Sequence, residues 1–334
     1  MPTARETTDI RPADPLATPW SRAFGLRVPV VNAPMGGVAG GALAAAVTAA
    51  GGLGMIGMGS AATPEALHRE IDRACAITGP FGIGLVDWVA ARRPALLAAA
   101  LDARPALLAV SFGDELTWVS RAHERGIRTA TQVFTAEHAR RAADAGIDVL
   151  VARGSEGGGH GAVTMATLPL LDAVLAAVDV PVLAAGGIGS AASLAAVLAA
   201  GASGAWVGTG LAACAESLLS PSGRAAMLAA DGADTVVTTA VDVALDYPWP
   251  AHFPSRVLRN EFVTEWTGRE DALRADTAAR DALRAGIAAD DPRLLPVDAG
   301  QGVGLVTAVE PVADVLDAWC RGAAGLLAAR PAGH

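Results

Sequence analysis

The stretch PVLAAGGIGSAASLAAVLAAGASGAWVGT, residues 181–209, reads as two consecutive strand–loop–helix units. An apolar run at 181–185 leads into a glycine-rich loop, then into an alanine-rich helical segment that ends near Gly201, and a second apolar run follows at 204–208. A glycine at this point is typical of a helix end, because the left-handed backbone of many helix termini costs glycine little. Runs that are apolar throughout are typical of parallel strands covered by helices on both faces.

The same rhythm repeats along the chain from residue 28 onward. Between helical stretches, several of which end in glycine as at Gly126 and Gly146, lie eight short apolar runs. We expect these runs to be strands, at 28–33, 53–58, 81–86, 106–111, 127–132, 148–153, 181–185 and 204–208. Eight such units favour an α/β fold of the (β/α)8 or TIM-barrel type, and a doubly wound open sheet is the alternative.

The rhythm stops after residue 215. Residues 216–296 look polar and helical, and 297–306 lead into a last helix near 311–328. We therefore expect two parts, a barrel made of residues 1–215 plus 297–334, and a helical insert at 216–296 that follows strand 8 and covers the mouth as a lid.

The charge pattern excludes several classes of function. The chain has 334 residues and a net charge of −9, and its 25 cationic residues are all arginine. Nucleic-acid binding needs clustered positive charge, which this acidic chain lacks. Without lysine, no Schiff base with a substrate carbonyl or pyridoxal phosphate can form.

The cysteines and the apolar segments bear on location. The cysteines are sparse and without CxxC spacing, at positions 75, 214 and 320. This pattern suggests a reducing compartment, with no disulfide framework and no metal site. The apolar stretch 33–62 is cut by Gly51-Gly52 and is rich in alanine and glycine, so a buried helix and strand explain it better than a membrane span. We expect a cytoplasmic protein that does not enter the membrane.

The loops after the strand carboxyl ends are the candidate site, because such loops build the active sites of these barrels. In NAPMGG (32–37), Pro34 fixes the backbone and glycines admit a ligand closely. The loops at 184–190 and 207–212 follow strands 7 and 8, where phosphate is often bound. Their candidate phosphate ligands are Gly186, Gly187, Gly208 and Thr209. Ordinary glycine punctuation before a helix is the alternative interpretation.

The loop GSEGGGH (154–160) has four glycines within six residues and then one histidine. Gly157, Gly158 and Gly159 remove side chains where a planar ligand could lie against the backbone. His160 then projects into the mouth, where a neutral imidazole can accept a proton at physiological pH. His160 is the candidate catalytic base.

Six motifs together resemble those of the nitronate monooxygenase (2-nitropropane dioxygenase) family of FMN-dependent TIM barrels. They are APMGG (33–37), AAAVTAAGGLGMIG (44–57), GSEGGGHG (154–161), the opening stretch (181–209), RVLRNEFVTEW (256–266) and AGQGVGL (299–305). The same motifs are similar to those of enoyl-[acyl-carrier-protein] reductase II and of an NADH:quinone reductase in the same superfamily.

The resemblance implies a noncovalent FMN and assigns residues to it. The implied cofactor-binding residues are Ala33, Pro34, Met35, Gly36, Gly84, Gln132, Gly158, Gly159, Gly186, Gly187, Gly208 and Thr209. His160 would act as the base toward the acid carbon of a nitroalkane. Independently of the resemblance, the densest aromatic run of the chain, YPWPAHF (247–253), lies in the insert, and aromatic linings are typical of small-molecule pockets. Packing of the insert on the barrel rim is the alternative. The candidate substrate contacts are Trp88, Tyr247, Trp249 and Gln301.

The implied activity is that of an FMN-dependent nitronate monooxygenase, which oxidises alkyl nitronates or nitroalkanes with O2 to carbonyl compounds and nitrite. The alternative is an NAD(P)H-dependent flavin reductase, and a flavin-storing or partner-binding barrel is the non-enzymatic reading. The expected partners are a small-molecule substrate and O2, with a monomer or homodimer as the assembly. Three departures stand out. Some relatives carry lysine at the position of Gln132, and several have asparagine in the loop after strand 3, where this chain has GIGLVDW (82–88). Relatives often have a neutral or acidic residue at the position of Arg153, which here either holds an oxygen of flavin or substrate or pairs with a carboxylate such as Glu156.

Overall fold

The structure is a computed structural model that describes residues 16–74 and 78–329, so Cys75 lies outside the described residues. Eight parallel strands form one sheet in the order β1-β9-β8-β6-β5-β4-β3-β2. Their bounds are β1 Val30–Asn32, β2 Gly54–Met58, β3 Phe81–Val86, β4 Leu107–Ser111, β5 Arg128–Val133, β6 Val149–Arg153, β8 Val182–Ala185 and β9 Gly204–Val207. Each coincides with a run predicted as a strand to within two residues at either end, which confirms the eight-stranded α/β barrel.

A buried asparagine closes the barrel between its first two strands. Val31 and Leu53 form a single bridge there. Next to it, the Asn32 side chain donates from Nδ2 to the Met55 carbonyl at 2.8 Å and accepts from the Met55 amide through Oδ1 at 2.7 Å. The amide side chain thus supplies the pair of bonds that a longer β1 would supply, and no backbone group of Met55 is left unpaired.

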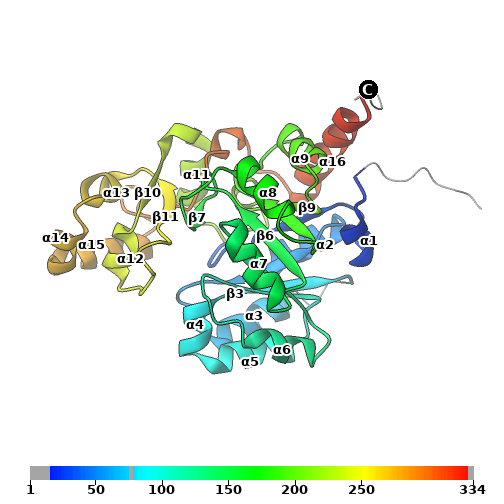
Figure 1. Cartoon of the computed structure of the whole chain (residues 1–334). Coiled ribbons are helices and arrows are strands. Elements are labelled where there is room, and N and C mark those ends of the chain that lie inside the picture. The colour runs from blue at the N-terminus through cyan, green and yellow to red at the C-terminus, as the bar shows by residue number, and fades with distance from the viewer. Residues whose placement is uncertain (1–15, 75–77, 330–334) are drawn as a thin grey trace, which may run out of the picture.

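Helices surround the barrel (Figure 1). Those that follow the eight strands of the barrel are α2 Gly41–Ala49, α3 Pro64–Arg73, α4 Asp87–Arg92, α5 Pro94–Asp102, α6 Trp118–His123, α7 Ala136–Asp144, α8 Thr167–Leu175, α9 Ala191–Ala199 and α10 Thr209–Ala212. The predicted glycine helix ends are confirmed, since φ is +70° at Gly126, +90° at Gly146 and +101° at Gly201. The last helix, α16 Val312–Ala328, packs against α9 and α2 and so completes the ring.

Alternate residues of each strand face the inside and the outside of the barrel. Leu107, Val149 and Leu183 belong to the inner cluster, whereas the adjacent Leu108 and Leu150 pack with the surrounding helices. Both sets are buried, which explains why the strands are apolar along their whole length. The amino-terminal end of the barrel is closed by α1 Pro19–Ala23, whose Trp20 joins the inner cluster.

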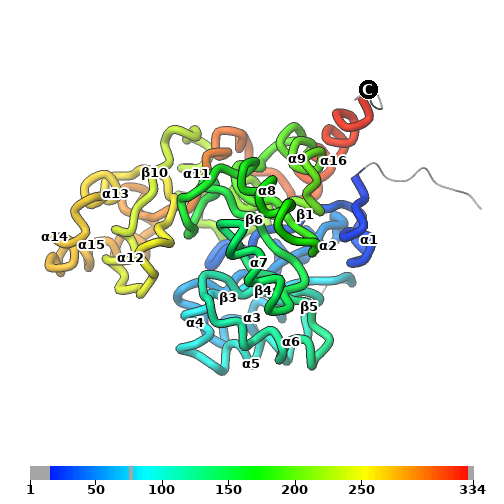
Figure 2. The backbone as a smooth tube through the Cα atoms, viewed as in Figure 1, coloured from blue at the N-terminus to red at the C-terminus, as the bar shows by residue number. Residues whose placement is uncertain are grey.

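Between α10 and α16 the backbone leaves the barrel, forms a projecting segment and returns (Figure 2). Its elements are α11 Pro221–Ala229, η1 Gly232–Asp234, β10 Thr235–Thr238, α12 Ala240–Leu245, β11 Ser255–Leu258, α13 Glu261–Trp266, α14 Glu270–Ala275, α15 Thr277–Ala288 and η2 Val303–Leu305. The predicted insert at 216–296 is therefore mostly but not wholly helical. The sequence analysis missed β10 and β11, which pair antiparallel because the β-branched run TVVT has a strand to bond to.

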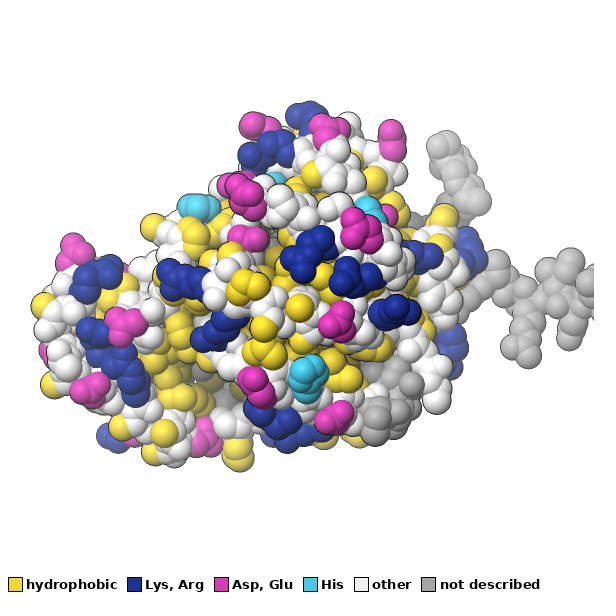
Figure 3. All heavy atoms as spheres, turned by 90° about the horizontal axis from the view of Figure 1, so that it is seen from below, with side chains coloured by type: hydrophobic (Ala, Val, Ile, Leu, Met, Phe, Trp, Pro, Cys, Tyr) yellow, Lys and Arg dark blue, Asp and Glu magenta, His cyan; other side chains and the backbone are white. Residues whose placement is uncertain are grey.

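The second sheet ties the projecting segment to the barrel. β11 pairs on its other edge with β7, Gly159–His160, in the loop that follows β6. Seen from below, hydrophobic side chains gather where the projecting segment meets the barrel (Figure 3). Within the described residues, none of the helices combines the length and apolar character that crossing a membrane requires.

Candidate active site

A cavity of about 840 Å³ opens at the carboxyl ends of the strands, under the projecting segment. Its volume lies within the range of small-molecule and cofactor sites. All twelve predicted cofactor residues line it, together with His160, Tyr247 and Trp249. Two predicted substrate residues do not: Trp88 packs edge-on behind Trp249, and the Gln301 side chain is exposed.

The loops after β8 and β9 leave open space on the cavity side. Gly186 and Gly187 have φ of +108° and +68°, which a residue with a side chain adopts only under strain. A Cβ added at Gly208 would come no closer to any atom than 3.6 Å, so nothing in the protein fills that space. Thr209 Oγ1 accepts a hydrogen bond from the Gly300 amide at 2.9 Å, which fixes its hydroxyl at this edge.

The loop after β1 lies tightly on the neighbouring strands. A Cβ at Gly84 would come within 2.2 Å of Pro34 Cγ, and one at Gly36 within 2.4 Å of Gly59 Cα. Glycine is required at both positions, because Gly84 lies against the ring of Pro34 and Gly36 against the backbone of Gly59, whatever else the cavity holds. The result is a floor formed by Ala33 to Gly36.

Arg153 at the end of β6 holds the glycine-rich loop in place. Its Nη2 donates to the carbonyls of Gly157, Gly158 and Gly159, at 2.9, 3.0 and 2.9 Å. The residue is 6% exposed. Burial, and then the neighbouring Arg256, lower the pKa of its guanidinium to about 10, so the group stays charged at neutral pH.

In this arrangement Arg153 does not form the predicted pair with Glu156. The carboxylate of Glu156 accepts from the amide and hydroxyl of Thr167 instead. Arg153 donates instead to carbonyls of its own loop, and it therefore orders the backbone that leads to His160.

His160 is held by three parts of the projecting segment. Its backbone pairs with Ser255 of β11. Its Nε2 lies 3.1 and 3.0 Å from Oδ1 and Oδ2 of Asp242 on α12. Its ring stacks on Trp249, with centroids 3.6 Å apart and planes 6° from parallel, and Trp249 Nε1 in turn donates to Ser60 Oγ at 2.9 Å.

Asp242 is the site residue that sequence reasoning missed. It is only 5% exposed and lines the cavity beside His160. Burial raises the pKa of its carboxyl and nearby Asp298 acts in the same direction, while the hydrogen bond to His160 opposes them. An aspartate 82 residues from the histidine, on a helix of six residues, gives no local signal of this contact.

Beyond His160 the cavity extends along the projecting segment. Its walls there are apolar and include Val241, Leu245, Ile287 and Leu295. We call this part the apolar arm. It suits the hydrocarbon part of a ligand, because burying apolar groups stabilises binding.

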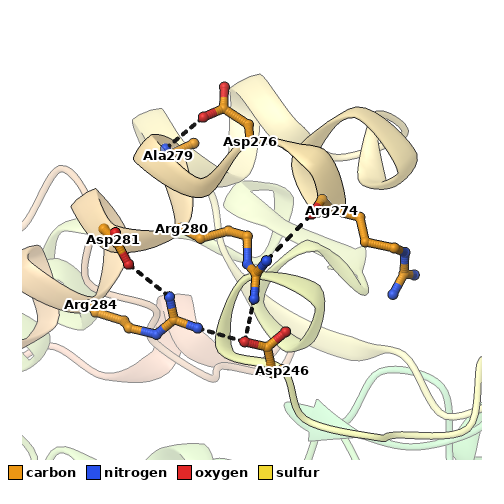
Figure 4. Close-up of polar contacts among 7 residues, drawn as sticks. All are labelled: Asp246, Arg274, Asp276, Ala279, Arg280, Asp281 and Arg284. Carbon is orange, nitrogen blue, oxygen red and sulfur yellow. Dashed lines mark hydrogen bonds and ion pairs between the residues drawn. The ribbon is translucent and has the colours of Figure 1, made fainter.

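An arginine pair fixes the end of α12 (Figure 4). Asp246, with φ of +58°, ends the helix in the left-handed region. Arg280 and Arg284 of α15 both donate to its Oδ2, the latter at 2.8 Å. Since Tyr247 follows directly, this contact positions the segment that carries Tyr247 and Trp249 to the cavity.

Comparison with known proteins identifies the family. The family model for nitronate monooxygenase matches residues 18–322. The chain belongs to the nitronate monooxygenase family. It is therefore an enzyme, and family and structural neighbours together make it a flavin-dependent oxidoreductase. Over residues 16–74 and 78–329, no three His, Cys, Asp or Glu side chains are grouped in a way that could hold a metal ion.

Three relatives show the range of chemistry around this fold. A (3aS,4S,5R,7aS)-5-hydroxy-7a-methyl-1-oxo-octahydro-1H-indene-4-carboxyl-CoA dehydrogenase of Mycobacterium tuberculosis is 36% identical, over 74% of this chain and 68% of its own length. The structure of nitroalkane oxidase from Streptomyces ansochromogenes is 29% identical with a TM-score of 0.80, covering 93% of this chain and 100% of the other. FabK from Thermotoga maritima is 26% identical with a TM-score of 0.80, covering 93% and 97%.

Proposed function

We propose that the protein is an FMN-dependent nitronate monooxygenase, which converts alkyl nitronates, or nitroalkanes, and O2 to carbonyl compounds and nitrite. The observation that carries this proposal is the position of His160, which lines the glycine-rich cavity with its ring fixed by Asp242 and Trp249.

The cavity residues fit FMN. The amides of Gly187 and Gly208 and the Thr209 hydroxyl would hold the phosphate, in space that added side chains would fill. Ala33, Pro34, Met35 and Gly36 would lie against the ring, with Gln132 near its polar edge. Gly158 and Gly159, whose carbonyls are fixed by Arg153, would border the opposite side. When bound, FMN supplies an electron acceptor that reacts with O2.

In this proposal His160 acts as a base toward neutral nitroalkanes. It takes the proton from the acid carbon, and the electron pair of the broken C–H bond moves onto the nitro group as the nitronate forms. A substrate already ionised needs orientation only. His160→Asn should therefore lower kcat/KM about 10²–10⁴-fold with neutral nitroalkanes, the usual range for loss of a general base. The loss should be much smaller with nitronates. His68→Asn, at an exposed position on α3, is the matched control.

The test of the function is release of nitrite. Purified, FMN-loaded protein is mixed with propionate-3-nitronate and with alkyl nitronates in air. Nitrite and carbonyl product above the level of free FMN support the proposal, and no nitrite from either substrate overturns it.

A second candidate is an NAD(P)H-dependent flavin reductase. The dehydrogenase relative at 36% identity and the similarity to FabK favour it. Anaerobic mixing with NADH or NADPH separates the candidates, because rapid bleaching of the flavin absorbance is expected of a reductase and slow or absent bleaching of a nitronate monooxygenase.

A further inference from the structure

The projecting segment holds the two ring edges of His160 in unequal surroundings. Nε2 faces a carboxylate at 3.0 and 3.1 Å. Nδ1, by contrast, has no hydrogen-bond partner within the described part of the chain. An ionised carboxylate only accepts hydrogen bonds, so the hydrogen of a neutral imidazole must be on Nε2. The lone pair is then on Nδ1.

The surroundings of Asp242 make this contact hard to replace. The carboxylate is almost fully buried, so water does not compete for it. Both oxygens lie at hydrogen-bond distance from the same nitrogen, which keeps the acceptor close if either one moves. The stacked Trp249 ring fixes the plane of the imidazole, and pairing of β7 with β11 fixes its backbone. Tilt, plane and position of the ring are thus all set by the projecting segment.

We propose that Asp242 is the positioning residue for His160: it keeps the hydrogen on Nε2, so that Nδ1 is the atom that takes the proton from the substrate. This inference rests on the proposed function and specifies its base. In the step, the substrate C–H bond breaks, its electron pair moves onto the nitro group, and the proton bonds to Nδ1. The resulting imidazolium is stabilised by the Asp242 carboxylate, as in other sites where a third group orients the catalytic base.

The first test reads the tautomer without using activity. In ¹⁵N-histidine-labelled protein, the signals of His160 are assigned by their loss in His160→Gln. At a pH where the ring is neutral, we expect the hydrogen on Nε2 in the wild type, with and without FMN, and a shift toward the Nδ1–H form in Asp242→Asn. A wild-type ring with its hydrogen on Nδ1 overturns the inference, whether or not the protein makes nitrite.

The second test separates positioning from a purely structural role. Asp242→Asn should lower kcat/KM for neutral nitroethane about 10–10³-fold. This loss is no larger than the one expected when the base itself is missing. With the preformed nitronate the change should stay within about threefold, and FMN affinity should not change, because the nitronate needs no base. Asp242→Glu should recover part of the activity. Equal losses with both substrates, or a loss under threefold with nitroethane, contradict the inference.

Asp271→Asn is the control for these variants. It removes an exposed carboxylate from α14 in the same projecting segment and should change neither the spectrum nor the kinetics. If neither the wild type nor any variant forms nitrite, the proposed function is wrong. The NMR measurement of the His160 tautomer still tests the role of Asp242 in that case.

Discussion

Replacing Arg153 by methionine should destabilise the protein and release the loop that carries His160. Methionine keeps an apolar stem of similar length but leaves the carbonyls of Gly157, Gly158 and Gly159 without their donor. One amino group of the guanidinium has two hydrogens, so these three contacts amount to about two full hydrogen bonds. At ~1.5–3 kcal/mol for each bond to a charged group, the two bonds amount to ~3–6 kcal/mol. Because the cost of burying the guanidinium is recovered, we expect a net loss of about 2–5 kcal/mol.

Thermal unfolding of the apoprotein measures this loss. A change of this size corresponds to a fall in Tm of about 3–7 °C for a chain of this length, because the entropy of unfolding grows with the number of residues. The matched control is Arg141→Met, because Arg141 forms an ion pair with Asp114 in which the side chains are 59% and 79% exposed. Such exposed pairs contribute about 0–1 kcal/mol to the free energy of unfolding, so the Tm of Arg141→Met should be close to that of the wild type.

The result that refutes the reasoning is a Tm for Arg153→Met within about 2 °C of the Arg141→Met value. That outcome would mean the buried guanidinium gains no more from the three carbonyls than its burial costs. A large fall in Tm without any loss of FMN affinity would mean that Arg153 stabilises the fold and that the order of its loop does not affect cofactor binding.

Three further changes test other parts of the account. Gly208→Ala should raise the Kd for FMN about 5- to 100-fold, because overfilling the site costs ~1–3 kcal/mol of binding free energy. The same change should leave the unfolding of the apoprotein in urea unchanged. Gly84→Ala, by contrast, should lower the urea midpoint of the apoprotein, because its Cβ would meet Pro34. If the apolar arm holds the substrate chain, kcat/KM for nitrite release should rise up to about fourfold per added methylene from nitroethane to nitrohexane. In Ile287→Asp this rise with chain length should be much smaller. An equal rise per methylene in both proteins argues against binding of the chain in the apolar arm. Asp148→Asn should unfold at lower urea than the wild type at pH 7, and the difference should shrink as the pH falls below about 4. Burial raises the pKa of this carboxyl, but hydrogen bonds from a histidine and a threonine outweigh it and lower the pKa, so the stability is present above the ordinary aspartate pKa and is lost as pH falls through the lowered one. A difference that does not shrink as the pH falls contradicts that reasoning.

The barrel was predictable because its strands are buried on both faces. A run such as DVLVAR at 148–153 needs no alternation to be recognised, and glycine at a helix end has a local physical cause. The predicted strand bounds exceed the observed ones by one or two residues at half of the ends, as at 28–33 against Val30–Asn32, since the ends of a strand depend on the partner strand.

The second sheet and the contact between Asp242 and His160 could not be predicted in the same way. β7 has two residues, one of them glycine, and no propensity marks such a segment as a strand. The contact of Asp242 with His160 needs β11 to pair with β7 and α12 to lie beside it, which is tertiary structure. Trp249 was predicted as a substrate contact from local aromatic density alone. The structure adds that it stacks on the imidazole.

The most direct test of the central claim is a crystal structure of the protein with FMN bound. The account predicts the phosphate within hydrogen-bond distance of the amides of Gly187 and Gly208, the ring against Pro34 to Gly36, and the His160 imidazole beside the ring with Asp242 on its far nitrogen. A phosphate bound away from these two loops, or an imidazole turned out of the cavity, would contradict it.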